Sequence, residues 1–270
     1  MPQDVDFYSI PRLYDILHAR GTAHDVQTAR GLQSRFVPRR PGPSTWLEPA
    51  CGTGRYLRYA SRRGIHGVGF DISRPMINFA RRAKRGPLLS RVRKRGSLTF
   101  FTARMEDFDR THALPPIDLA YNPINTIRHL TSDRAMVDHF RAVASVLRPG
   151  AVYLVGISLC AYGLESPTED VWIGREGATR VVQVAQYLPA TGSRGEAARA
   201  ERVISHLTVT RGRREHHINS TYALRSYDLA QWEEIIDRAG LDVVGVTDGD
   251  GHHAVPMGPG YFLYVLRPRK

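Results

Sequence analysis

The feature that most constrains the fold is a stretch of small and apolar residues at 45–57, TWLEPACGTGRYL. Trp46 and Leu47 form an apolar run typical of a short buried strand, Glu48 closes it, and small residues then lead into a helical pattern. Small residues allow a tight backbone turn and the close approach of a ligand. The first turn of a helix offers free N–H groups to whatever binds there. The stretch therefore predicts a ligand-binding strand–loop–helix unit.

The glycine spacing in this loop indicates which ligand it holds. A dinucleotide fingerprint, Gly-x-Gly-x-x-Gly or Ala, needs a small residue for close helix–strand packing where this chain has Leu57. An NAD-dependent oxidoreductase is therefore disfavoured. The pattern instead resembles the first motif of the class I S-adenosylmethionine-dependent methyltransferases, carried here by Glu48, Ala50, Gly52 and Gly54. Ala50 stands where the family usually has its first glycine, and an ordinary glycine-containing turn is the alternative interpretation.

A carboxylate stands where the next strand is expected to end. Residues 66–71, HGVGFD, are predicted to form that strand, and Asp71 follows Gly54 by 17 residues. At this distance a nucleoside-binding unit places an acid that accepts hydrogen bonds from ribose hydroxyls. Asp71 could instead cap the following helix, but Ser73 and Pro75 already supply the signals of a helix start. We therefore expect Asp71 to bind the ribose.

The chain alternates strands and helices as far as residue 159. Further β-prone segments lie at residues 98–102, 116–123 and 151–159. The helical pattern before the last of them begins after Ser132 and includes Leu147. Such alternation favours a parallel sheet with helices on both faces. The Leu-x-Pro-Gly turn at residues 147–150 adds to the resemblance to the methyltransferases.

The alternation breaks after residue 159. We expect residues 160–178 to form a polar loop. Three β-prone segments follow, at residues 179–188, 202–210 and 216–224. They predict an antiparallel insertion that covers the substrate, with Tyr162 and Trp172 as candidate substrate contacts, although these aromatics could equally form the insertion's own core. A helix at 229–239 and strands at 241–246 and 261–266 complete the predicted elements.

The resemblance implies a Rossmann-like doubly wound α/β sheet of seven strands, the last antiparallel, with an antiparallel β insertion as a lid. The implied domains are an N-terminal helical cover at 1–43, the cofactor-binding core at 44–159, the insertion at 160–225 and the completion of the core sheet at 226–270. The implied cofactor is S-adenosylmethionine, with S-adenosylhomocysteine as its product. The implied cofactor-binding residues are Tyr14, Glu48, Ala50, Cys51, Gly52, Gly54, Asp71, Ile72, Met105, Glu106 and Asn122.

One of these positions departs from the family pattern. After the third strand the family has an acid followed by a hydrophobic residue, and this pair borders the adenine. Here Arg104 stands in the place of the acid and precedes Met105, while Glu106 comes after it. Met105 can still pack on the adenine ring, and Glu106 is a nearby acid that could take over the contact to the adenine amino group.

The stretch that follows the fourth strand, residues 118–130, resembles the Asp-Leu…Asn-Ser/Thr-Leu-x-His-Leu segment of small-molecule methyltransferases. The resemblance implies that Asn122 faces the methionine part of the cofactor and that His129 lies near the methyl group. His129 is the candidate general base, because its pKa can lie near neutrality. It could instead only orient Asn125, a candidate substrate contact, or cap the next helix. We expect methyl transfer to N or O of a small molecule, mainly by holding the reacting atoms in line.

Two other functions remain open at this stage. The net charge of +12 and a pI near 10.1 are compatible with an RNA or DNA methyltransferase, and Asn122-Pro123 partly matches the motif of amino-methylating nucleic-acid enzymes. All but three of the 38 basic residues are arginine, which weakens charge as an argument, and we expect the eight basic residues within 81–95 to be solvated. The chain could also be a non-catalytic S-adenosylmethionine-binding protein.

The sequence offers no pattern for a metal site or a membrane anchor. Two cysteines, Cys51 and Cys160, make neither a disulfide framework nor a metal cluster, and the pair His252-His253 supplies only adjacent ligands. No run is long enough to span a bilayer, and the N-terminus lacks a signal pattern. We therefore expect a cytoplasmic protein that acts on a small molecule, with its oligomeric state open.

Overall fold

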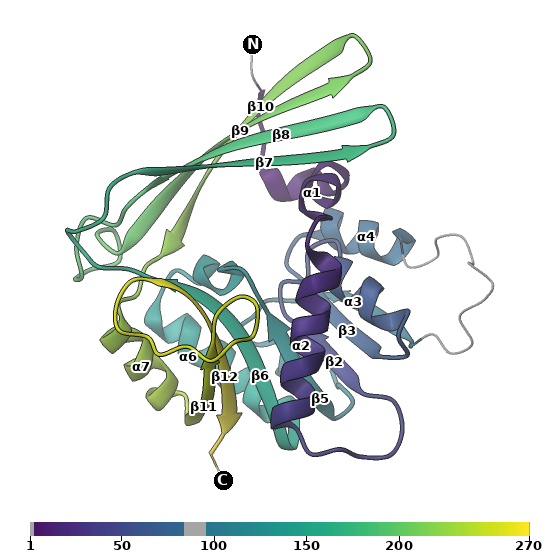
Figure 1. The fold of residues 1–270 in the computed structure, drawn as a ribbon, viewed down its shortest axis with the longest axis vertical. Coiled ribbons are helices and arrows are strands. Elements are labelled where there is room, and N and C mark those ends of the chain that lie inside the picture. Colours follow the sequence, from purple (N-terminus) through teal and green to yellow (C-terminus); the bar gives the residue numbers. More distant parts are fainter. Residues whose placement is uncertain (1–2, 84–95, 270) are drawn as a thin grey trace.

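The computed structural model describes residues 3–83 and 96–269. They form a seven-stranded sheet flanked by helices, and a second sheet lies beyond one end of it (Figure 1). The strands of the seven-stranded sheet are β2 (Thr45–Glu48), β3 (His66–Asp71), β4 (Leu98–Thr102), β5 (Ile117–Asn122), β6 (Leu147–Leu159), β11 (Leu241–Thr247) and β12 (Gly260–Pro268). The helices are α1 (Pro11–His18), α2 (Thr22–Phe36), α3 (Arg55–Ser61), α4 (Arg74–Ala83), α5 (Phe108–Thr111), α6 (Asp133–Val146) and α7 (Leu229–Arg238), with short 3₁₀ turns η1 (Phe7–Ser9) and η2 (Thr126–His129).

The strand order of the seven-stranded sheet is β11-β12-β6-β5-β2-β3-β4. Strands β2 to β6 run parallel, whereas β12 is antiparallel to both β6 and β11. This confirms the predicted doubly wound sheet of seven strands with its last strand antiparallel. The order reverses between β2 and β5, and ligands bind in such folds at the carboxyl ends of the strands beside this reversal.

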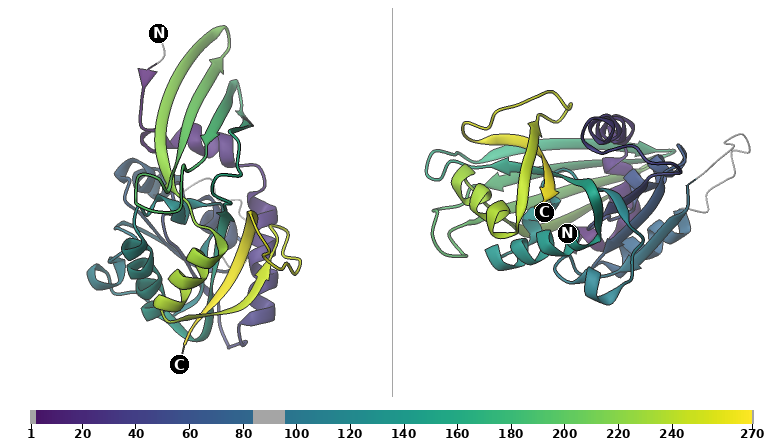
Figure 2. Two further views of the ribbon diagram at one scale, coloured as in Figure 1. Left: turned by 90° about the vertical axis from the view of Figure 1, so that its left-hand side faces the viewer. Right: turned by 90° about the horizontal axis from the view of Figure 1, so that it is seen from below.

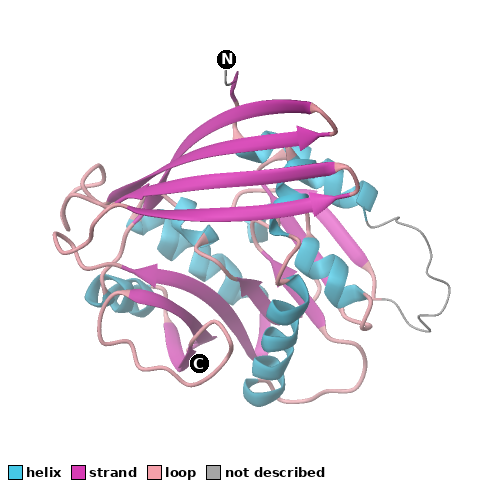
Figure 3. Ribbon diagram, turned by 45° about the horizontal axis from the view of Figure 1, so that its top comes forward, coloured by secondary structure: helices cyan, strands magenta, loops and turns pink. Residues whose placement is uncertain are grey.

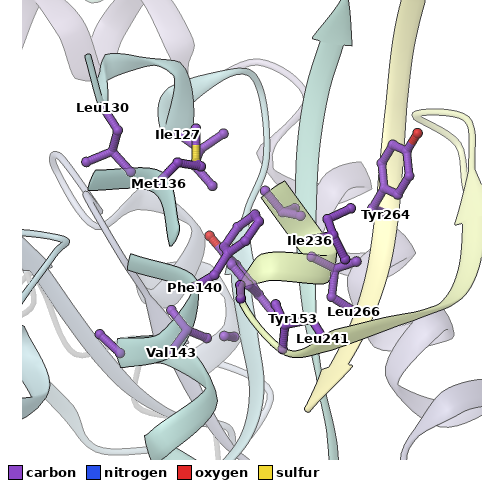
Figure 4. Close-up of a cluster of buried hydrophobic side chains, with 14 of the residues drawn as sticks. Ile127, Leu130, Met136, Phe140, Val143, Tyr153, Ile236, Leu241, Tyr264 and Leu266 are labelled. Carbon is purple, nitrogen blue, oxygen red and sulfur yellow. The ribbon is translucent and has the colours of Figure 1, made fainter. Parts of the chain in front are cut away.

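Helices cover both faces of this sheet and bury a separate apolar cluster on each (Figure 2). Helices α2, α3 and α4 pack on one face, where Leu32, Leu57 and Ile77 are buried with Trp46 of β2. The other face is covered by α5, α6 and α7, and Figure 4 shows Phe140 of α6 among its buried side chains. These apolar faces fix the parallel strands, so the loops at their carboxyl ends have defined positions.

Leu57 packs closely on β3 although it is large. A Cβ atom built on Gly67 would lie 3.1 Å from the Leu57 Cβ, and one on Gly69 would lie 2.8 Å from its Cδ1. The two glycines of the strand thus leave room for a leucine on the helix. The sequence argument that Leu57 is too large for close helix–strand packing was therefore wrong in its physical basis.

The second sheet has the strand order β1-β10-β9-β8-β7. Its strands are β1 (Gln3–Asp4), β7 (Thr168–Glu176), β8 (Thr179–Leu188), β9 (Ala200–Arg211) and β10 (Arg214–Arg225). Strands β7 to β10 pair antiparallel in chain order, as expected for the insertion, while β1 joins β10 in parallel. Its inner face packs on η1 and α1 through a cluster that includes Phe7, Leu17, Val181 and Leu207.

Two expectations about these elements were wrong. Residues 168–176, expected to be loop, form β7, which pairs with β8 over its whole length. Gly174 and the polar residues hide the strand pattern, but Gly174 is required there: a Cβ atom on it would lie 2.2 Å from the carbonyl oxygen of Ile16. Leu147, expected on a helix, belongs to β6 and pairs with Ile117.

Most of the basic stretch 81–95 lies outside the described residues, which leave out 84–95. In the ranges that are described, no helix is both long and apolar enough to cross a membrane.

Candidate active site

The loop after β2 is held in a conformation that suits small residues. Ala50, Gly52 and Gly54 all have positive φ angles, of 48°, 52° and 66°. Ala50, which replaces the family's first glycine, thus adopts a left-handed conformation that costs an alanine roughly 1 kcal/mol. No residue with a side chain fits at Gly54, because a Cβ atom there would lie 2.6 Å from the ring of Phe100. The backbone of Cys51 donates to the carbonyl of Phe70 at 2.8 Å and anchors the loop on β3.

Asp71 lies at the end of β3, beside this loop. One carboxylate oxygen accepts a hydrogen bond from the backbone N–H of Gly52 and the other from that of Ser73, each at 2.8 Å. Burial raises the pKa of Asp71, and the two backbone donors offset part of that effect. Asp71 therefore fixes the glycine loop to the end of β3. The Ser73 hydroxyl, 3.4 Å from the backbone nitrogen of Met76, supplies the predicted cap of α4.

A cavity of about 410 Å³ lies between the carboxyl ends of the parallel strands and the second sheet. The sequence-predicted residues that line it are Tyr14, Glu48, Ala50, Cys51, Asn122, Asn125, His129 and Trp172. They come from α1, the loop after β2, the end of β5, the segment around η2, and β7. The structure therefore brings together residues that are up to 158 positions apart, from Tyr14 to Trp172.

Glu48 is buried on one side of this cavity. Within the described residues its Oε2 atom has no hydrogen-bond partner. Burial raises the pKa of Glu48 to about 8, and the nearby Arg55 guanidinium counteracts part of that rise. A buried carboxyl group with a free oxygen is suited to a cationic ligand, because a positive charge would stabilise its ionised form.

Arg55 lines the same cavity, although the sequence analysis did not single it out. Its guanidinium donates to the Thr22 hydroxyl at 2.8 Å and lies over the ring of Tyr56, 3.8 Å from the centroid. Its nearest ion pair, with Asp25, is 4.0 Å long. This side chain is only 10% exposed, and among the described residues its ion pair with Asp25, at 4.0 Å, is too long for a direct hydrogen bond. The position of Arg55 directly after Gly54 was the feature of the sequence that could have indicated its place in the cavity.

The two asparagines of the site differ in how they are engaged. The Asn122 amide donates to the carbonyl of Pro49 at 2.9 Å, while its buried Oδ1 is without a partner among the residues described. The Asn125 amide donates to the Ser158 hydroxyl at 2.8 Å and accepts from the Ser158 backbone at 2.6 Å. Asn122 therefore keeps a free acceptor, whereas Asn125 mainly joins η2 to β6.

His129 is hydrogen-bonded to an N-terminal tyrosine. The Tyr8 hydroxyl lies 2.8 Å from His129 Nε2, and the two rings meet edge-on. Burial, followed by the neighbouring Arg128 charge, lowers the pKa of His129 to about 4. The imidazole is therefore neutral at physiological pH. Burial also raises the pKa of Tyr8, which keeps its hydroxyl protonated.

Trp172 and Tyr162 lie in different places. Trp172 lies on the inner side of β7 and lines the cavity, where its ring meets that of His18 at 5.5 Å. Tyr162 does not line it: its hydroxyl donates to the Ser226 carbonyl at 2.9 Å and lies 3.0 Å from Gln231 Oε1. Tyr162 thus joins the chain after β6 to the start of α7, and its expected place at the substrate was wrong.

The second sheet contributes cavity residues that the sequence analysis did not name. They include Tyr187, Glu201 and Tyr222. Glu201 Oε2 is 3.3 Å from Arg128 Nη2, and the Arg128 side chain is 4% exposed. For Tyr187 and Tyr222 the available signal was alternation within the predicted strands, since successive residues of a strand point to opposite faces. It could not tell which face would meet the core. Glu201 lies just before the predicted strand 202–210.

Ile72, Met105 and Glu106 lie beside the cavity rather than in its lining. Ile72 is 66% exposed next to Asp71. Asp71 pairs with Thr102 in the sheet, which brings the chain after β4 to the same edge. There Glu106 accepts from Arg104 at 2.7 Å, and Met105 packs against the buried cluster on the α6 face. Arg104 is therefore tied to the acid that follows it.

Comparisons with known proteins decide the family. Residues 47–150 match the sequence model of the methyltransferase domain family. The chain contains a class I S-adenosylmethionine-dependent methyltransferase domain. The dTDP-3-amino-3,4,6-trideoxy-alpha-D-glucopyranose N,N-dimethyltransferase of Streptomyces venezuelae is 24% identical over 255 residues, which are 94% of this chain and 96% of that protein.

Solved structures of other methyltransferases share the fold. DesVI of Streptomyces venezuelae matches with a TM-score of 0.69 and 22% identity, over 98% of this chain and 100% of its own. The sugar N-methyltransferase KedS8 from Streptoalloteichus matches with a TM-score of 0.66 and 20% identity, over 96% and 92% of the two chains. The likeness therefore includes the second sheet as well as the methyltransferase domain.

The residues of the methyltransferase site fit S-adenosylmethionine. The orphaned buried oxygens of Glu48 and Asn122 are acceptors for a cationic amino acid moiety. The loop from Ala50 to Gly54 carries only small side chains at Ala50, Gly52 and Gly54, all with positive φ angles, and so presents its backbone to a ligand. Among the described residues, no group of three or more His, Cys, Asp or Glu is placed to hold a metal ion.

Proposed function

We propose that this methyltransferase transfers methyl groups to the amino nitrogen of a small amino sugar or of a related glycosylated compound. The observation that carries the proposal is the single cavity that joins Glu48 and Asn122 to His129, Trp172 and Glu201. One side of that cavity is built from the motif residues of the cofactor site, and the opposite side from the second sheet. The relative from Streptomyces venezuelae, named for an amino sugar, supports the nitrogen acceptor.

The proposed donor site uses the residues that the sequence motifs indicated. Asp71 would bind the ribose, Ile72 and Met105 would pack on the adenine, and Glu106 would accept from its amino group. Backbone groups from Ala50 to Gly54, together with Tyr14, would enclose the methionine part. Asn122 and Glu48 would face its positive charge. Arg55, a buried cation without a close carboxylate, would pair with its carboxylate.

When bound, S-adenosylmethionine supplies a methyl group on a positively charged sulfur. The role of the chain is to place an amine in line with that methyl group, and such positioning lowers the barrier by several kcal/mol. Asp170 and Glu201 line the acceptor side of the cavity. Glu201 is paired with Arg128, so the negative charge of Asp170 would attract a protonated amine from solution. Residues 160–225 would act as the lid that excludes water around it.

His129 would take part in removing the amine proton. A protonated amine must lose one proton to expose the lone pair that attacks the methyl carbon, and the methylated nitrogen must lose another to become neutral. A neutral imidazole can accept one of these protons, and the other passes to solvent. The hydrogen bond between His129 Nε2 and the Tyr8 hydroxyl would hold the ring in place during this step. With Nε2 as the donor of that bond, Nδ1 keeps the lone pair that accepts the amine proton. Tyr8 is therefore a positioning residue in the proposal, acting through His129.

Replacing His129 by alanine tests this role. We expect turnover to fall by roughly a hundredfold, while the affinity for S-adenosylhomocysteine, measured by calorimetry, stays unchanged. The matched control is His24→Ala, since His24 is an exposed histidine paired with Asp250. Full activity of His129→Ala would remove His129 as the base. Loss of cofactor affinity in that variant would make it a binding residue instead.

A further inference from the structure

A buried histidine on α6 is hydrogen-bonded at both of its ring nitrogens. His139 is fully buried, and α6 lies on the face of the seven-stranded sheet opposite to α2, with the strands between the two helices (Figure 3). The His139 Nδ1 atom lies 3.0 Å from the carbonyl oxygen of Met105, and Nε2 lies 2.9 Å from the Tyr153 hydroxyl. His139 thus joins β6 to the chain that follows β4, and it does not line the cavity.

The two partners fix which ring nitrogen of His139 carries the proton. A carbonyl oxygen can only accept, so Nδ1 carries the hydrogen and donates to Met105. Burial lowers the pKa of His139 to about 4, although the Met105 hydrogen bond and the Glu106 charge counteract it, and the ring is neutral at physiological pH. Nε2 therefore accepts from the Tyr153 hydroxyl, whose pKa is raised by burial.

The Met105 carbonyl belongs to the peptide group that precedes Glu106. A peptide group is planar, so a hydrogen bond to its oxygen fixes the plane and the direction in which both flanking side chains leave the backbone. Two residues earlier the chain is tied to β3, where the N–H of Ala103 donates to the Asp71 carbonyl at 3.2 Å. His139 provides the next anchor of this segment.

The Glu106 carboxylate is also held from its solvent side. Arg104 donates to it at 2.7 Å, and the two side chains are 61% and 21% exposed, in the order Arg104 and Glu106. An exposed ion pair alone holds a carboxylate weakly. The hydrogen bond from α6 supplies a buried constraint on the same residue.

We infer that His139 is a positioning residue for adenine recognition, acting through the Met105 carbonyl to hold the Glu106 carboxylate where it accepts from the adenine amino group. The inference rests on the donor site proposed above and deepens it. It extends that site to a helix none of whose residues line the cavity. It also explains how Glu106 can serve although it lies two positions after Arg104, which stands in the place of the family's acid.

Selectivity between two ligands tests the inference. Calorimetry gives the affinities for S-adenosylhomocysteine and for S-inosylhomocysteine, whose hypoxanthine has an oxygen where adenine has its amino group. An oxygen cannot donate to a carboxylate, so the wild-type protein should prefer the adenosyl compound by roughly thirtyfold. His139→Leu removes the donor to Met105 and should lower this preference to below about fivefold.

A matched variant separates the hydrogen bond from the packing of the ring. Asparagine has nearly the shape of leucine, but its amide nitrogen is bonded to Cγ, as Nδ1 of histidine is, and can donate to the Met105 carbonyl. His139→Asn should therefore keep the wild-type preference. His139→Phe, which keeps an aromatic ring without the donor, should behave like His139→Leu.

Val143→Ala is the control for a general loosening of α6, because it removes buried apolar volume and no hydrogen bond. It should leave the preference unchanged, and urea denaturation measures the stability of each variant. A wild-type preference in His139→Leu and His139→Phe, or an equal loss in His139→Asn or Val143→Ala, would overturn the inference and leave the adenine contact in place. Equal binding of both compounds by the wild-type protein would overturn the adenine contact itself, and the inference with it.

Discussion

At the scale of single residues, the site combines a buried acid with a buried arginine. Glu48 and Arg55 both line the cavity, and each lowers the cost of burying the other. Neither is neutralised by a close ion pair: Glu48 has a free Oε2 among the described groups, and the Arg55–Asp25 distance is 4.0 Å. A zwitterionic amino acid moiety supplies both missing charges.

The raised pKa of Glu48 predicts how stability and cofactor affinity change with pH. Folded Glu48 holds its proton up to a pH of about 8, whereas the unfolded chain loses it near 4.5. The free energy of unfolding of the ligand-free protein therefore falls as the pH rises through this interval. A cationic donor favours the carboxylate, so the affinity for S-adenosylmethionine should increase as the pH rises toward about 8 and level off above it.

Calorimetry at a series of pH values measures this effect. In Glu48→Gln, which keeps the shape and cannot ionise, that part of the pH dependence should vanish. The same pH dependence in both proteins would show that Glu48 does not meet the positive charge of the donor.

Asp71→Asn tests the ribose site. The carboxylate accepts from Gly52 and Ser73, and an amide turns an N–H group toward one of these donors. We expect the affinity for S-adenosylhomocysteine to fall by about 1 to 3 kcal/mol. Asp109→Asn is a suitable control, because its carboxylate accepts only from the exposed Ser145 hydroxyl. Unchanged affinity in Asp71→Asn, with an unchanged melting temperature, would contradict the assignment.

The sequence predicted part of the site residues and missed others for a physical reason. Glycine spacing and the strand-end acid pointed to Gly52 and Asp71, which lie hydrogen-bonded to each other outside the lining of the cavity, and their role in cofactor binding stays a prediction. Such backbone requirements are local and can be predicted from sequence. Tyr8 and Tyr222 meet His129 only through the packing of η1 and β10. No spacing within one segment reports a contact between residues 129 and 222.

At the scale of elements, a buried ion network joins the second sheet to the core. Asp133 at the start of α6 accepts from Arg199 at 2.8 Å and from Arg225 at 2.9 Å. These arginines precede β9 and end β10, and their side chains are 7% and 6% exposed. Burial raises the pKa of Asp133, but the arginine hydrogen bonds outweigh it and lower the pKa below 3.8. The stabilisation is therefore present above that pH and lost below it.

Asp133→Asn should destabilise the protein by about 3 kcal/mol, because it leaves two buried guanidinium groups without a counter-ion. Urea denaturation measures the change. Asp138→Asn, which breaks the exposed pair with Arg134 on the same helix, should cost less than about 1 kcal/mol. Equal effects of the two substitutions would mean that the network does not anchor the second sheet.

Most elements of the core could be predicted, because their boundaries are written in caps and periodicity. Asp228 forms a capping box with Gln231 at the start of α7, and Ser132 caps α6. Strand β7 could not be predicted from the sequence. Its polar and glycine residues fit an edge strand only when β8 and α1 are in place. Strand β1 is two residues long and carries no pattern of its own.

At the scale of the whole molecule, the cavity lies between the seven-stranded sheet and the second sheet. The seven-stranded sheet supplies the methyltransferase motifs, and the second sheet supplies Trp172, Tyr187 and Glu201. The net charge of +12 contrasts with the acids on the acceptor side, Asp170 and Glu201. Arg128 pairs with Glu201 at 3.3 Å, so Asp170 is the acid that would meet the protonated amine of the proposed acceptor.

Mass spectrometry with methyl-deuterated S-adenosylmethionine tests the proposed reaction most directly. The acceptor is a dTDP-linked 3-amino sugar, and the matched control is the same compound with a hydroxyl group in place of the amine. We predict that the amino compound gains the mass of one or two deuterated methyl groups on its nitrogen, while the hydroxyl compound gains none. Methylation of the hydroxyl compound would contradict the nitrogen acceptor proposed for this enzyme. Formation of S-adenosylhomocysteine without methylation of either compound would contradict it as well.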